Sequence, residues 1–199
     1  TDLFCAAQVQ LPGGEGVIIS GGDNWTGLNT TNRGNSDSTY FRLSDTSLSS
    51  GSGMALKRWY ATATVLLNGE VMIQGGIGDT VDNAPYSEIR SAAGIYRPLT
   101  GFTTANIGWQ YPRNFVVSGG RVFGFDTGGT MYYIDPTGNG SITKFPSFPD
   151  PKSVGSTAAM FRPGKILQFG GTSAAALVID VSAGGAPVVT PTQSLSAQR

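Results

Sequence analysis

One phrase recurs four times along the chain and constrains its fold more than any other feature. Each copy is an apolar segment, a turn built on Pro-Gly, Asn-Gly or Gly-Gly, and a second apolar segment. The copies read VQLPGGEGVIISGGD from Val9, VLLNGEVMIQGGI from Val65, FVVSGGRVFGFDT from Phe115 and MFRPGKILQFGGT from Met160. Turn residues that accept positive φ, placed between apolar segments, predict antiparallel β-hairpins.

The second apolar segment ends in Gly-Gly in three copies, and Phe125-Asp126 takes that place in the third. The positions Gly22, Gly76, Asp126 and Gly171 recur about every 50 residues, which is typical of kelch-type propeller blades. Glycine here would let a neighbouring strand approach closely. A further strand-like segment follows each hairpin, and these segments read STYFRLS, AAGIYRP, MYYIDP and AALVIDV.

The repeat predicts an all-β chain, a kelch-type β-propeller with blades at approximately 1–54, 55–104, 105–152 and 153–199. A β-sandwich of similar hairpins is the alternative, although sandwiches seldom repeat a four-strand unit. A propeller must close, because otherwise its first and last blades expose strand edges. We therefore expect four blades of seven, with the remainder of the propeller supplied by the same precursor; a closed four-bladed propeller is the other arrangement.

Composition excludes several classes of function. Hydrophobic residues make up 39% of the 199, so the chain is expected to fold. The formal net charge is zero and no basic stripe is present, which argues against nucleic acid as a partner. No apolar run is long enough for a membrane span. With no histidine and one cysteine, a Ser-His-Asp triad, a His/Cys zinc site and an internal disulfide are all excluded.

The single cysteine, Cys5, lies in DLFC, and the next blade begins with the sequence KRWYATATVLLNGEVMIQGG. With VIISGG, YPRNF and PGKILQFGG, these segments resemble the catalytic propeller of the galactose oxidase and glyoxal oxidase family, the mononuclear copper-radical oxidases. The resemblance extends over essentially the whole chain. Its hairpins occur in any kelch protein, whereas FC and RWY in matching blades are more specific. The resemblance implies a thioether between Cys5 and Tyr60.

In that family the cross-linked tyrosine binds copper and stores one oxidising equivalent as a radical. The resemblance therefore implies oxidation of a primary alcohol or aldehyde by O2, with H2O2 as the second product. A sulfur ortho to the phenol oxygen would donate electron density to the radical on Tyr60, and Cu(II) suits sites of nitrogen and oxygen ligands. Structural roles remain open as well: a small buried hydrophobe for Cys5 and ring packing for Tyr60.

The resemblance also implies that Arg113, in Tyr111-Pro112-Arg113, contacts substrate hydroxyls through its fork of donors. A salt bridge at the rim is the alternative role for this arginine. Three further copper ligands, a second tyrosine and two histidines, come from later blades and the following domain in the family. Since this chain has no histidine, one copper ion would need ligands outside it, and the 199 residues alone are expected to be inactive.

One position departs from the family. A tryptophan stacks over the cross-linked ring in galactose oxidase, eighteen residues after the tyrosine, and counting from Tyr60 gives Gly78. The ring would then be more exposed or be shielded from another loop, for example by Trp25, and galactose becomes a doubtful substrate. A small alcohol, aldehyde or carbohydrate remains the expected class.

Three glycosylation sequons begin at Asn24, Asn29 and Asn139, and they are usable only in a secretory host. The resemblance implies a secreted or cell-surface protein. The alternative function is a kelch-like propeller that binds carbohydrate or attaches to a surface without catalysis, and Gly78 favours it.

Overall fold

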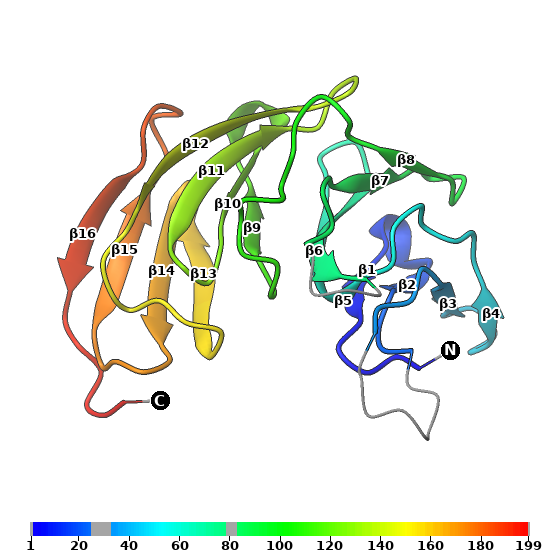
Figure 1. The fold of residues 1–199 in the computed structure, drawn as a ribbon, viewed down its shortest axis with the longest axis horizontal. Helices are drawn as coiled ribbons and strands as arrows, with labels where there is room; N and C mark the ends of the chain where they lie inside the picture. Colours follow the sequence, from blue (N-terminus) through cyan, green and yellow to red (C-terminus); the bar gives the residue numbers. More distant parts are fainter. Residues whose placement is uncertain (1, 25–32, 79–82, 199) are drawn as a thin grey trace. The chain divides into compact units, whose positions relative to one another are not determined.

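The computed structural model describes residues 2–24, 33–78 and 83–198, and these residues form an almost wholly β structure (Figure 1). Within them, sixteen strands make four antiparallel sheets of four strands each. Every strand pairs with the strand before or after it in sequence, so each sheet is a simple meander. Two short 3-10 turns, Pro12–Gly14 and Ser118–Gly120, lie inside hairpin connections.

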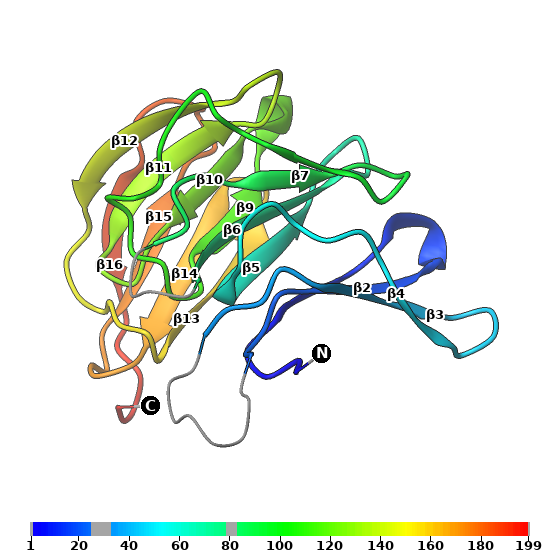
Figure 2. The same ribbon diagram turned by 45° about the vertical axis from the view of Figure 1, so that its right-hand side comes forward.

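The first two sheets occupy the N-terminal half of the chain (Figure 2). The first contains β1 (Ala7–Gln10), β2 (Gly16–Ser20), β3 (Ser38–Arg42) and β4 (Leu48–Ser50). The second contains β5 (Trp59–Val65), β6 (Val71–Ile77), β7 (Glu88–Arg90) and β8 (Tyr96–Pro98).

The other two sheets follow in the C-terminal half. The third contains β9 (Arg113–Val116), β10 (Val122–Phe125), β11 (Thr130–Asp135) and β12 (Ser141–Ser147). The fourth contains β13 (Ser156–Arg162), β14 (Lys165–Gly170), β15 (Ala176–Asp180) and β16 (Val188–Thr192).

The chain divides into two compact units, each with its own apolar core. Residues 1–112 and 136–140 form the first unit, and residues 113–135 and 141–199 form the second. Aliphatic side chains from the first two sheets make the first core, with Ile18, Val71 and Ile73 almost fully buried. The second core is more aromatic and includes Phe123 and Phe125. Burying such side chains is the main stabilising contribution to a β-fold of this size.

The expected all-β, propeller-like class is confirmed by these four-stranded sheets. Each of the ranges 1–54, 55–104, 105–152 and 153–199 contains one sheet. The kelch type, the seven blades and the single partial propeller over 1–199 stay predictions.

In the second sheet, the segment expected to follow the hairpin directly forms a different strand. AAGIYRP contains its fourth strand, β8, while the third is the short β7. In the other three sheets the quoted segment contains the third strand, and the sequence did not locate the fourth. These fourth strands are exposed or polar, as in β4 and β12, and so lack a run of apolar residues.

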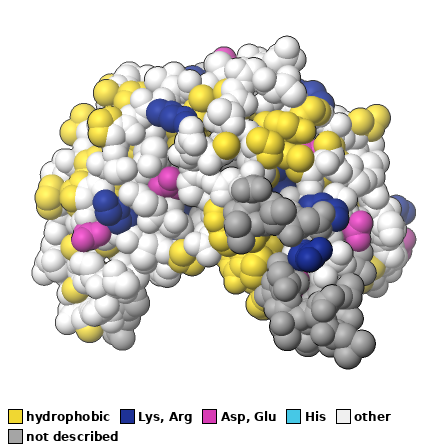
Figure 3. All heavy atoms as spheres, viewed as in Figure 1, with side chains coloured by type: hydrophobic (Ala, Val, Ile, Leu, Met, Phe, Trp, Pro, Cys, Tyr) yellow, Lys and Arg dark blue, Asp and Glu magenta, His cyan; other side chains and the backbone are white. Residues whose placement is uncertain are grey.

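On the face shown in Figure 3, basic and acidic side chains are few and scattered among uncharged atoms. No helix in the described part of the chain has the length and apolar character needed to cross a bilayer.

Candidate functional site

Three residues at the starts of successive sheets share an unusual backbone conformation. Cys5 has φ of 56°, Tyr60 has 70° and Tyr111 has 44°. Among the described non-glycine residues, only Thr46, in an exposed turn, also has positive φ. The left-handed region costs an L-residue about 1–2 kcal/mol, and such strain persists only where the surroundings fix it. The strained positions therefore mark a candidate site.

Backbone hydrogen bonds join these three residues in a row. The Tyr60 N–H donates to the Cys5 carbonyl oxygen at 3.0 Å, and the Tyr111 N–H donates to the Tyr60 carbonyl oxygen at 2.8 Å. Cys5 precedes β1 by two residues, Tyr60 is the second residue of β5, and Tyr111 precedes β9 by two residues. The three residues thus occupy similar places in the repeat, and each is tied to the next.

The side chains of the three residues also meet. The Cys5 thiol lies near both the Tyr60 and the Tyr111 hydroxyls and raises the pKa of each. The two phenol rings contact each other edge to face, with centroids 5.0 Å apart. All three side chains are half-buried, and Cys5 is a thiol outside any disulfide. We call Cys5, Tyr60 and Tyr111 the thiol–phenol cluster.

Burial raises the pKa of Tyr60 above its ordinary value, and the hydrogen bond to Cys5 raises it further. The pKa of Tyr111 is raised for the same two reasons, in the same order. Both causes favour the neutral phenol, since a buried phenolate lacks solvation and only the protonated oxygen can donate to sulfur. At neutral pH the cluster therefore holds neutral phenols.

Two tryptophans enclose the Tyr60 ring. Trp59 contacts it edge to face with centroids 4.2 Å apart, and Trp109 does so at 5.7 Å. The two indoles stack on each other at 6.5 Å. The position eighteen residues after Tyr60 is Gly78, which has no ring. The sequence therefore left shielding by a residue of another loop as one expectation. Trp109, in the β8–β9 connection, covers the Tyr60 ring in this way. The suggested Trp25 lies outside the described residues.

The Gly75–Gly76 pair of β6 holds Trp109 in place. The Gly76 N–H donates to the Trp109 carbonyl oxygen at 2.8 Å. Gly75 has φ of +75°, and a Cβ there would lie 2.6 Å from the same oxygen and 2.8 Å from Pro112 Cδ. A side chain could not fit, so this glycine allows the predicted close approach.

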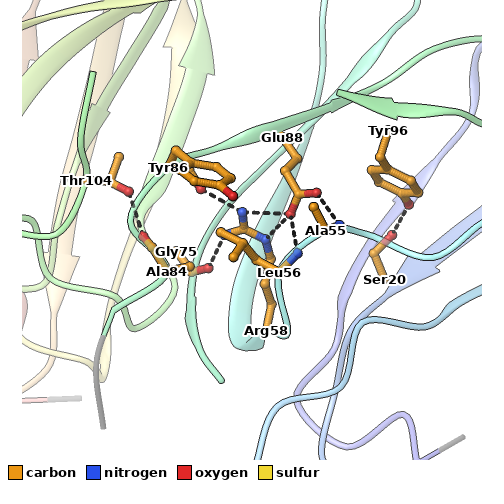
Figure 4. Close-up of polar contacts among 10 residues, drawn as sticks. All are labelled: Ser20, Ala55, Leu56, Arg58, Gly75, Ala84, Tyr86, Glu88, Tyr96 and Thr104. Carbon is orange, nitrogen blue, oxygen red and sulfur yellow. Dashed lines mark hydrogen bonds and ion pairs between the residues drawn. The ribbon is translucent and has the colours of Figure 1, made fainter. Parts of the chain in front are cut away.

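A fully buried ion pair fixes the chain just before Tyr60 (Figure 4). Arg58 Nη2 and Nε donate to Glu88 Oε2 at 3.0 and 3.2 Å. The guanidinium also donates to the carbonyl oxygens of Gly75 and Tyr86, each at 2.7 Å. Burial lowers the pKa of Arg58, and Glu88 opposes this effect. Four hydrogen bonds from the guanidinium thus hold the buried pair, which makes it a rigid internal support.

Arg113 belongs to the second compact unit and is not a member of the thiol–phenol cluster. Its Nη2 donates to the carbonyl oxygens of Ser153 and Val154, at 3.4 and 2.9 Å, and to that of Ser156. Burial lowers its pKa. These bonds hold the segment that leads into β13, which is a structural role. Its contact with substrate remains a prediction.

The residues present do not complete a copper site. Tyr60, Tyr111 and Cys5 offer two phenol oxygens and a thiol, but the sequence contains no histidine. In the described part of the chain, no three His, Cys, Asp or Glu side chains gather closely enough to hold a metal. Cu(II) prefers nitrogen and oxygen ligands in tetragonal geometry, so the cluster alone does not fit this ion.

Of the three sequons, Asn24 and Asn139 are exposed, and Asn29 lies outside the described residues.

Sequence analysis predicted that Cys5 and Tyr60 lie near each other, but it missed Tyr111 and Trp109 as neighbours. Tyr111 stands in the segment YPRNF, in which the resemblance assigns a role only to Arg113. Its place at a sheet start, two residues before an inner strand like Cys5, is the signal that could have identified it.

Comparison with known proteins finds similar solved structures and no sequence-level match. No family model matches the chain, and no curated protein does. The structure is similar to that of a fungal alcohol oxidase of the AA5 family, described in complex with copper, with a TM-score of 0.80 at 16% identity. The match covers 100% of this chain and 44% of that one. The chain thus shares its fold with under half the length of that enzyme.

Proposed function

We propose that this chain is part of a copper-radical oxidase in which Cys5 and Tyr60 form a thioether-linked radical group. One observation carries the proposal: the Tyr60 N–H donates to the Cys5 carbonyl oxygen at 3.0 Å, and both residues hold left-handed backbones, which brings the thiol and the phenol into one site. The fold shared with a copper alcohol oxidase supports it. The substrate would be a primary alcohol or aldehyde, oxidised by O2 with release of H2O2.

The proposed thioether requires a two-electron oxidation. The Cys5 S–H bond and one ortho C–H bond of Tyr60 break, and a C–S bond forms between the two residues. The two protons and two electrons pass to dioxygen, which becomes H2O2. The closeness of the Cys5 thiol to the Tyr60 phenol favours this coupling, because the two reacting groups are already held in one site.

Residues around the cluster would then protect the radical. Trp59 and Trp109 cover the Tyr60 ring and limit access of water and reductants to it. Bound copper would supply the second one-electron centre. Its remaining ligands would come from outside these 199 residues, from the rest of the propeller in the same precursor. Secretion is part of the proposal, and the exposed sequons Asn24 and Asn139 are compatible with it.

The test uses the intact protein, expressed from its complete gene, before and after exposure to Cu(II) and air. Oxidation should lower its mass by two hydrogen atoms, protect Cys5 from alkylation and yield one peptide pair joined through Cys5 and Tyr60. Tyr60→Phe is the matched control and should keep an alkylatable Cys5. An unchanged mass with an alkylatable Cys5 in the oxidised parent protein would overturn the proposal.

A second candidate is a propeller module without catalysis. The absence of histidine from these 199 residues favours it. It predicts that Cys5 stays alkylatable after copper and air, and that immobilised carbohydrate retains the protein whether or not Tyr60 is replaced by phenylalanine.

A further inference from the structure

We propose that a groove between the first two sheets binds an acidic carbohydrate through the guanidinium groups of Arg42 and Arg90. The groove has a volume of about 480 Å³ and is lined by β3, by β4 with the residues after it, and by the β7–β8 hairpin. All of these elements belong to the first compact unit, and no residue of the thiol–phenol cluster lines the groove. The inference therefore does not depend on the proposed oxidase.

Strand β3 presents two of the side chains that line the groove. Tyr40 and Arg42 are two residues apart, so they lie on the same face of the strand, together with Ser38. Ser49 of β4 lies directly opposite Tyr40, so its hydroxyl is on that face too. The Tyr40 hydroxyl donates to the Glu15 carbonyl oxygen at 3.0 Å, which fixes the ring. The Arg42 guanidinium lies 5.8 Å from the centre of this ring and is oriented by it.

Tyr96 brings the second arginine to the same groove. Arg90 and Tyr96 lie directly opposite each other in the β7–β8 pair, so both side chains are on one face of the second sheet. The hydroxyl of Tyr96 hydrogen-bonds that of Ser20 at 2.8 Å (Figure 4) and that of Ser38 at 2.7 Å. These bonds tie the two sheets together. Because Ser38 shares the face of β3 that carries Arg42, both arginines face the groove between the sheets.

The charge that lines the groove is entirely positive. None of the described residues that line it is an aspartate or a glutamate. Arg42 forms an ion pair with Asp45 at 3.9 Å, but both side chains are about half exposed, so the pair contributes little. Arg90 Nη1 donates to the Ser91 carbonyl oxygen at 3.4 Å, which is a long hydrogen bond. Two cations at one groove repel each other, so a bound anion would stabilise the unit.

The rest of the lining favours an acidic sugar over a free ion. Ser49, Ser50 and Ser52 offer hydroxyls that both donate and accept hydrogen bonds. Gly94 leaves room for the guanidinium, since a Cβ there would lie 3.3 Å from Arg90 Nη2. A groove of about 480 Å³ is larger than a sulfate or phosphate ion requires. The carboxylate or sulfate of the sugar would meet the guanidinium groups while its hydroxyls meet the serines.

The experiment titrates the intact protein with trigalacturonate, a sulfated disaccharide, the neutral methyl ester of trigalacturonate and sodium sulfate, and calorimetry measures each affinity. Arg42→Gln and Arg90→Gln each remove one charge from the groove. Lys144→Gln is the matched control, because Lys144 is an exposed residue of β12 outside the groove. Circular dichroism and denaturant midpoints check that each variant folds.

At least one of the two acidic sugars should bind, and it should bind more tightly than the methyl ester and than sodium sulfate. Each arginine variant should weaken this binding about three- to tenfold, while Lys144→Gln should leave it unchanged. The tighter of the two acids identifies carboxylate or sulfate as the group that the arginines recognise.

Three results would overturn the inference. The first is no saturable binding of either acid up to about 10 mM. The second is binding of the methyl ester or of sodium sulfate as tight as that of the acids, and the third is equal weakening by Lys144→Gln and the arginine variants. The arginine variants should form the Cys5–Tyr60 link as the parent protein does, so a failure of the groove and a failure of the oxidase proposal are distinguishable.

Discussion

At the residue scale, backbone strain and hydrogen bonding both occur at the thiol–phenol cluster. Cys5, Tyr60 and Tyr111 hold positive φ, and main-chain hydrogen bonds join the three residues in a row. Each conformation alone would destabilise the fold, so the contacts among the three must compensate for it. Strain of this kind gathers at functional sites, which agrees with the proposed role of the cluster.

The raised pKa values of Tyr60 and Tyr111 predict a sensitivity of the reduced protein to alkali. Above about pH 10 the unfolded chain releases its phenol protons while the native cluster keeps them. The stabilisation from this source is complete below that pH and decreases as the pH rises toward the native values. Denaturant midpoints should fall between about pH 9 and 11, and the fall should be shallower in Tyr111→Phe. An equal flattening by the control Tyr40→Phe would contradict this.

At the scale of elements, the repeated hairpins made the architecture predictable. Alternating apolar segments around Gly-containing turns specify β5 and β6, or β13 and β14, without reference to the rest of the chain. The three-residue strands β4 and β7 were not predictable, because they form only where a longer neighbouring strand offers hydrogen-bonding partners.

The candidate site was predictable only in part, for a similar reason. Cys5 and Tyr60 could be paired through the resemblance of their motifs. Tyr111 and Trp109 lie in a connection without regular structure, and their approach depends on the Gly75–Gly76 pair of β6. Contacts of this kind arise from tertiary packing, so no local pattern records them.

The ion pair between β7 and the residue before β5 predicts a large effect on stability. Glu88→Ala would leave the Arg58 guanidinium buried without its carboxylate and remove acceptors of the Ala55 and Leu56 N–H groups. Such a change should lower the free energy of unfolding by about 3–5 kcal/mol. Urea denaturation measures it.

Glu70→Ala is the matched control within the same sheet. Glu70 pairs with Arg97 at 3.8 Å, with both side chains partly exposed, so its loss should cost under about 1 kcal/mol. Similar losses for Glu88→Ala and Glu70→Ala would contradict the assigned importance of the buried pair.

At the scale of the whole molecule, the chain shares its fold with 44% of a copper alcohol oxidase while containing no histidine. The proposed oxidase therefore needs ligands from beyond these residues. The chain would supply the radical group, and the rest of the propeller would supply most of the metal site.

This division predicts how copper is retained. After loading with Cu(II) and passage over a chelating resin, the 199-residue chain should keep little copper, whereas the intact protein should keep one ion per molecule. Metal analysis of both samples measures the difference. Stoichiometric copper on the short chain would show that its donor set is sufficient and would contradict the proposed division.

The link between Cys5 and Tyr60 is tested most directly by a crystal structure of the intact protein after exposure to copper and air. Continuous electron density should join Cys5 Sγ to the ring carbon beside the Tyr60 hydroxyl. Separate density for a thiol and an unmodified ring, at van der Waals distance, would contradict the proposal.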